Sequence, residues 1–85
     1  MWRPALRMLP GEIHWVNPSR ELAVGQSARF SVRIRYRQPL QGARLFVRET
    51  GAYLLFDEPQ RGITPGQFAA WYDGDELVGS GVIEA

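Results

Sequence analysis

The stretch from Ala28 to Arg37 alternates strictly between apolar and polar side chains. A side-chain period of two is typical of a β-strand with one buried and one solvated face. We therefore predict a strand here. Its inner face is expected to hold Ala28, Phe30, Val32, Ile34 and Tyr36, and its outer face Arg29, Arg33, Arg35 and Arg37. Neighbouring guanidinium groups repel one another, so this row predicts either nearby acids or an anionic partner.

The same pattern, with the turn signals between the segments, predicts further short strands over residues 12–16, 43–49, 52–56, 67–72 and 76–84. Pro65-Gly66 suits the centre of a type II turn, and Asp73-Gly74 is typical of a hairpin. Residues 57–64 read as a loop, and Gly79 and Gly81 indicate a bend or a close neighbour. No segment has two turns of helical period. Short strands separated by regular turn signals favour an all-β barrel or sandwich.

Residues 1–11 contain Pro4 and Pro10 and show no clear period. We predict that they form a tail or a connection to an upstream region. Residues 12–85 are then expected to form a single domain, since a chain of 85 residues suffices for one core.

Cysteine is absent and His14 is the only histidine, so we expect neither a disulfide nor a metal site. No apolar run is long enough to span a membrane and nothing resembles a signal peptide, so the expected location is cytoplasmic.

Charge is distributed unevenly along the chain. All ten basic residues are arginine, which suits bidentate contact with phosphate. Residues 1–56 hold nine arginines and three glutamates, whereas residues 57–85 hold one arginine and six acids. Either the two halves neutralise one another in the fold, or the arginines remain on a separate face and bind an anion.

Catalytic chemistry is poorly supported. Asp57 and Glu58 are adjacent, so on extended backbone they point to opposite sides and cannot act as an acid and base pair. No serine has an identifiable activating partner, and no glycine-rich phosphate loop is present. Most aromatic side chains are needed for the core, and Tyr36 and Tyr72 are the candidates for a ligand surface.

Two blocks carry a family resemblance: Arg-Ile-Arg-Tyr-Arg-Gln at 33–38, and residues 56–75. The second block opens with Phe-Asp-Glu-Pro-Gln-Arg-Gly and closes with Trp-Tyr-Asp-Gly-Asp. Together with Glu-Ile-His-Trp-Val at 12–16 and Gly-Ser-Gly-Val-Ile-Glu at 79–84, they resemble the C-terminal domain of bacterial tRNA-specific 2-thiouridylases. The resemblance implies a small closed six-stranded antiparallel β-barrel, similar to the second domain of translation elongation factors.

The resemblance also implies tRNA contacts at Arg35, Tyr36 and Gln67. The full expected tRNA-binding set adds their neighbours Arg33, Arg37 and Gln38. Strict alternation points the Tyr36 ring inward. Its backbone or hydroxyl would then make the contact, or a bulge near Gln38-Pro39 would rotate the ring outward.

The ATP-binding pyrophosphatase loop and the two sulfur-handling cysteines of that family have no counterpart here. We therefore expect no catalysis and no cofactor in this chain alone, which is either an isolated domain or a truncated paralogue. The expected partners are tRNA and the upstream catalytic and central domains, with no metal and no membrane.

The leading hypothesis is an accessory domain that positions tRNA for 2-thiolation of its wobble uridine. The alternative is a protein-interaction barrel without direct RNA contact, whose arginines pair with acids such as Asp57, Glu58 and Asp75.

Overall fold

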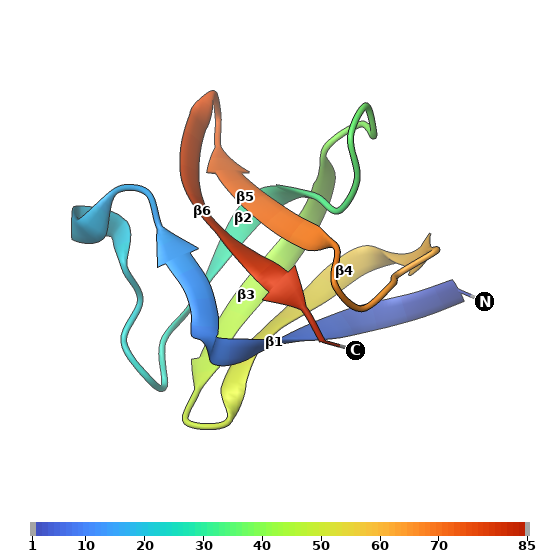
Figure 1. The fold of residues 1–85 in the computed structure, drawn as a ribbon. Helices are drawn as coiled ribbons and strands as arrows, with labels where there is room; N and C mark the ends of the chain where they lie inside the picture. The colour runs from blue at the N-terminus through green and yellow to red at the C-terminus, as the bar shows by residue number, and fades with distance from the viewer. Residues whose placement is uncertain (1, 85) are drawn as a thin grey trace.

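The computed structural model describes residues 2–84, which form six antiparallel strands closed into a barrel (Figure 1). The strands are β1 (Trp2–Trp15), β2 (Ser27–Arg33), β3 (Gln41–Arg48), β4 (Gly51–Arg61), β5 (Phe68–Asp73) and β6 (Glu76–Ile83). One 3-10 turn, η1 (Pro18–Arg20), lies between β1 and β2. Around the barrel the order is β1-β4-β3-β2-β5-β6. The expected closed six-stranded antiparallel barrel is therefore confirmed.

Alternation explains which side chains fill the barrel. In β4, Leu54 and Phe56 are buried while Leu55 between them is exposed. Trp71 of β5 is the largest fully buried side chain, and the Trp15 ring meets it edge-on with centroids 5.6 Å apart. Within residues 2–84, no helix is long and apolar enough to cross a membrane.

Strand β1 corrects the expectation that residues 1–11 form a tail. Residues 2–11 belong to β1, while Met1 lies outside the described residues. Leu6 and Met8 are 2% and 0% exposed and belong to the core. The prolines that obscured the pattern lie where the pairing register shifts, between Arg3 and Ala5 and between Met8 and Ile13. Proline is tolerated at such irregularities because it removes no regular ladder hydrogen bond.

The loop expected over residues 57–64 is wrong in its first part. Strand β4 continues to Arg61, where Gln60 pairs with Arg3 and Arg61 with Trp2 of β1. The sequence did not reveal this extension because its pairing partner had been assigned to the tail. The two expected turns are confirmed. Gly66 has a positive φ of 91° and the Gln67 N–H donates to the Thr64 carbonyl at 3.3 Å, while β5 and β6 form a hairpin after Asp73.

Two glycines of β6 allow strands to approach closely, as expected. A Cβ on Gly79 would lie 2.8 Å from Nε1 of Trp71 and 2.9 Å from the backbone oxygen of His14. A Cβ on Gly81 would lie 2.6 Å from Sδ of Met8.

Replacing Gly79→Ala is expected to lower the free energy of unfolding by about 1–3 kcal/mol, because the added methyl group overpacks the core against a backbone atom. Urea denaturation followed by tryptophan fluorescence measures this. Gly11→Ala is the matched control, since nothing lies within 4 Å of its added Cβ. Equal stability of the two variants would contradict the close packing at Gly79.

Candidate nucleic-acid interface

The segment after β2 forms a turn that Gln38 holds in place. Its side-chain oxygen accepts the Ile34 backbone N–H at 2.9 Å, and Nε of Arg33 donates to its backbone oxygen at 2.8 Å. Its amide nitrogen donates to Oε1 of Gln60 at 2.9 Å. Gln60 is only 5% exposed, so this bond anchors the turn to β4. Both the oxygen and the nitrogen of the Gln38 amide are therefore engaged within the protein. Direct contact of Gln38 with RNA stays a prediction.

Tyr36 points into solvent and is 86% exposed, so the inward ring expected from alternation is wrong. The reason is that β2 ends at Arg33, and the turn that follows places Tyr36 on the outside together with Arg35 and Arg37. The chain reverses through Arg37, whose φ of 66° is left-handed. This conformation costs a residue other than glycine about 1–2 kcal/mol. The Arg37 guanidinium carbon lies 5.5 Å from the centroid of the Tyr36 ring.

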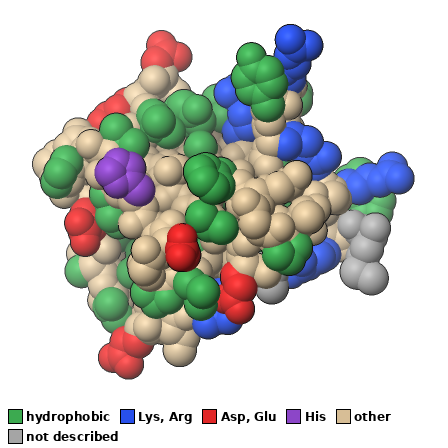
Figure 2. Space-filling model, viewed as in Figure 1, with side chains coloured by type: hydrophobic (Ala, Val, Ile, Leu, Met, Phe, Trp, Pro, Cys, Tyr) green, Lys and Arg blue, Asp and Glu red, His purple; other side chains and the backbone are tan. Residues whose placement is uncertain are grey.

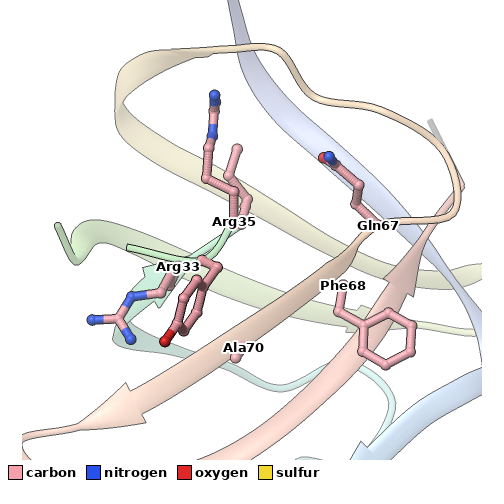
Figure 3. Close-up of a pocket in the computed structure, with 7 residues that line it drawn as sticks. Arg33, Arg35, Gln67, Phe68 and Ala70 are labelled. Atoms are coloured by element: carbon pink, nitrogen blue, oxygen red, sulfur yellow. The ribbon is translucent and has the colours of Figure 1, made fainter. Parts of the chain in front are cut away.

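The structure brings four of the predicted site residues into one groove of about 380 Å³. The groove is lined by Arg33, Ile34, Arg35, Tyr36, Gln67, Phe68 and Ala70. Figure 3 shows Arg33 and Arg35 on one side, and Gln67 and Phe68 on the other, where Phe68 is the first residue of β5 and Gln67 directly precedes it. The remaining two predicted residues, Arg37 and Gln38, belong to the same turn but do not line the groove.

Phe68 was not among the aromatic residues predicted for a ligand surface, because most aromatic side chains were expected in the core. It is 64% exposed. The signal was nevertheless present, because Ala69 and Trp71 are buried and alternation then places Phe68, Ala70 and Tyr72 on the outer face of β5. Tyr72, expected as a ligand-surface residue, is half-buried, and the Arg33 guanidinium carbon lies 5.7 Å from its ring centroid.

Ion pairs within residues 2–84 link the basic first part of the chain to the acidic last part. The pairs are Arg7 with Glu84 at 2.9 Å, Arg20 with Asp73 at 2.7 Å and Glu76 at 2.8 Å, and Arg29 with Asp57 at 2.5 Å. The two halves therefore do neutralise one another in part.

Arg29 belongs to the predicted outer row of arginines and is neutralised by an acid of the same chain, Asp57. Two hydrogen bonds join their side chains, at 3.0 and 2.5 Å. The hydrogen bond from Arg29 lowers the pKa of Asp57 below its ordinary value, and the same bond raises the pKa of Arg29. Both groups therefore stay charged at neutral pH, and each neutralises the charge of the other.

Arg33, Arg35 and Arg37 form no salt bridge with any carboxylate of residues 2–84. Arg33 donates to the carbonyl of Gln38, and Arg35 donates to the carbonyl of Arg61, which leaves their charges uncompensated. A guanidinium has five N–H donors, so each retains donors for an external anion. Figure 2 shows arginine side chains gathered at the upper right, while the visible acids lie mostly toward the left and below.

The chemistry available here is therefore anion binding beside exposed aromatic rings. The described part of the chain contains no group of three or more His, Asp or Glu side chains that could hold a metal ion.

Comparison with known proteins identifies the domain. The model of the aminomethyltransferase β-barrel domain family matches residues 7–83. The chain is 48% and 51% identical, each over 83 residues, to the tRNA-specific 2-thiouridylases MnmA of Christiangramia forsetii and Flavobacterium johnsoniae. These alignments cover 98% of this chain but 21% of each relative, so it spans about a fifth of their length. The chain therefore belongs to the aminomethyltransferase β-barrel domain family, in the group formed by the C-terminal domains of tRNA-specific 2-thiouridylases.

Proposed function

We propose that this barrel is an accessory domain that binds tRNA and orients it for 2-thiolation of the wobble uridine by a catalytic domain. The observation that carries this proposal is the set of three arginines, Arg33, Arg35 and Arg37, without carboxylate partners in residues 2–84. Guanidinium groups in such a position suit phosphate oxygens, which fix the orientation of a nucleic acid without reading its sequence.

The exposed groove residues support the same function. Tyr36 and Gln67 line the groove beside Arg33 and Arg35, and together they offer an aromatic ring, an amide and two cations to one ligand. Ribose hydroxyls, bases and phosphates are the RNA groups that such side chains contact. The proposed partners are tRNA and the catalytic and central domains that a protein of the relatives' length would supply, acting in the cytoplasm.

The competing function is a protein-interaction barrel that packs against other domains and makes no direct contact with RNA, so that its arginines pair with its own acids. This alternative predicts ion pairs between the arginine row and acids such as Asp57, Glu58 and Asp75. Within residues 2–84, Arg29 forms such a pair, with Asp57, whereas Arg33, Arg35 and Arg37 form none. The groove arginines instead lie at the end of the barrel that carries the loop after β2, away from the β3–β4 hairpin (Figure 1).

Titration of tRNA into the purified chain at about 0.1 M salt tests this function. Each phosphate contact adds about 0.7–0.9 to the logarithmic salt slope, so Arg35→Ala is expected to weaken binding roughly five- to eightfold at this concentration.

Arg48→Ala provides the matched control. Arg48 is likewise exposed and has no salt bridge within residues 2–84, but it lies at the end of β3 beside the β3–β4 hairpin. We expect Arg48→Ala to change the affinity for tRNA less than twofold, because salt largely screens a charge that lies far from the bound RNA. Equal effects of the two substitutions would refute a localised tRNA site.

A further inference from the structure

We propose that the groove at the end of β2 binds an unstacked nucleobase, with Tyr36 and Phe68 as its aromatic contacts. This inference rests on the proposed function and narrows the ligand from tRNA in general to an unpaired nucleotide of a loop, bulge or strand end.

The first argument is the exposure of the two rings. Tyr36 and Phe68 are 86% and 64% exposed, although aromatic side chains of a small domain are normally consumed by its core. They come from different elements, the turn after β2 and the start of β5, and they line the same groove. Exposed apolar side chains that line one concave surface are typical of a ligand site.

The second argument is the floor between them. Ile34 is 1% exposed and Ala70 is half-buried, so the base of the groove is apolar and set by the barrel core. Its volume of about 380 Å³ lies in the lower range of small-ligand clefts. An apolar floor with aromatic sides accepts a flat, uncharged group.

The third argument is the position of the charges and the amide. Arg33 and Arg35 line the groove without carboxylate partners among residues 2–84, and Gln67 precedes Phe68 directly. A nucleotide joins a flat base to an anionic phosphate, which matches this combination of ring, amide and guanidinium. The Gln67 amide can both donate to and accept from the edge of a base.

A continuous duplex would use only part of this surface. Its bases are stacked on one another, so it would offer phosphates to the arginines but no free base face to the rings. An unpaired base, in contrast, can stack on an aromatic side chain whatever its identity. The groove therefore distinguishes unpaired from base-paired RNA, and does not read the base sequence.

The test compares two RNAs of equal strand length, an unpaired oligouridylate and a blunt duplex, at one salt concentration. Phe68→Ala is expected to weaken binding of the single strand by about 5- to 160-fold, which corresponds to the loss of one base stacked on a ring. Binding of the duplex should change less than twofold. Phe68→Trp should retain single-strand affinity, and Phe68→Leu should not, because leucine keeps apolar surface but lacks a π-face.

Val24→Ala serves as the control for loss of an exposed apolar side chain elsewhere, since Val24 is 59% exposed and lies outside the groove. It should leave both affinities unchanged. The inference is overturned if Phe68→Ala has no effect on the single strand, or if it weakens both RNAs equally.

Arginine variants separate this inference from the proposed function. If Arg35→Ala weakens both RNAs while Phe68→Ala weakens neither, base binding is wrong and phosphate binding stands. If Phe68→Ala weakens the single strand while Arg35→Ala has no effect, the base site stands and the phosphate role is wrong. If neither RNA binds the unsubstituted chain, both proposals fail.

Discussion

Removal of residues 1–11 is expected to unfold the domain completely. The deletion takes away most of β1, which pairs with both β4 and β6, and so opens the barrel and exposes two strand edges. It also removes Leu6 and Met8, both buried in the core. Truncation of a buried leucine or methionine side chain lowers the free energy of unfolding by about 2–5 kcal/mol. The two together approach the whole stability of a domain this size, which is on the order of 4–13 kcal/mol.

Circular dichroism and amide dispersion in NMR spectra measure the effect. The shortened chain should show no cooperative thermal transition. In the full chain, Leu6→Ala and Met8→Ala should each lower the free energy of unfolding by about 2–5 kcal/mol. Leu9→Ala is the control, because Leu9 is 40% exposed and its truncation should cost less than about 1 kcal/mol. A folded chain of residues 12–85 would contradict the role assigned to β1.

Neutralising Arg33, Arg35 and Arg37 together is expected to weaken tRNA binding by about 100- to 500-fold at 0.1 M salt. The figure follows from three phosphate contacts, each contributing about 0.7–0.9 to the logarithmic salt dependence. Glutamine is the suitable replacement, because it removes the charge and keeps an amide donor for the contacts that Arg33 and Arg35 make with backbone carbonyls.

Fluorescence anisotropy with labelled tRNA measures this loss. A variant carrying Arg44→Gln and Arg48→Gln is the control, since both residues lie on β3 and neither forms a salt bridge within the described chain. It should bind within about threefold of the unsubstituted chain, because distant charges are largely screened at this salt concentration. A comparable loss in both variants would mean that net charge, and not the groove, controls binding.

Local patterns predicted much of the barrel. Alternation in β2 correctly assigned Phe30 and Val32 to the core, and the same pattern correctly assigned Ile34, just after the strand. It failed at Tyr36, which is exposed, because the turn held by Gln38 ends the strand at Arg33. That hydrogen bond between a side chain and the backbone has no signature in a pattern of apolar and polar residues.

Contacts between distant parts of the chain explain the other differences. The pairing of Trp2 and Arg3 with the end of β4 joins segments that lie 57–59 residues apart in the sequence, so neither segment alone indicates a strand. The ion pair between Arg29 and Asp57 likewise depends on the closed sheet. The groove itself needs the turn after β2 to meet the start of β5, although the exposed position of Phe68 could have been inferred from the burial of Trp71.

The logarithmic slope of tRNA affinity against salt concentration tests the central claim most directly, because it counts the phosphates that the protein neutralises. The unsubstituted chain should give a slope steeper by about 2–3 than the variant with glutamine at positions 33, 35 and 37. Indistinguishable slopes would contradict the assignment of these three uncompensated arginines to a tRNA backbone.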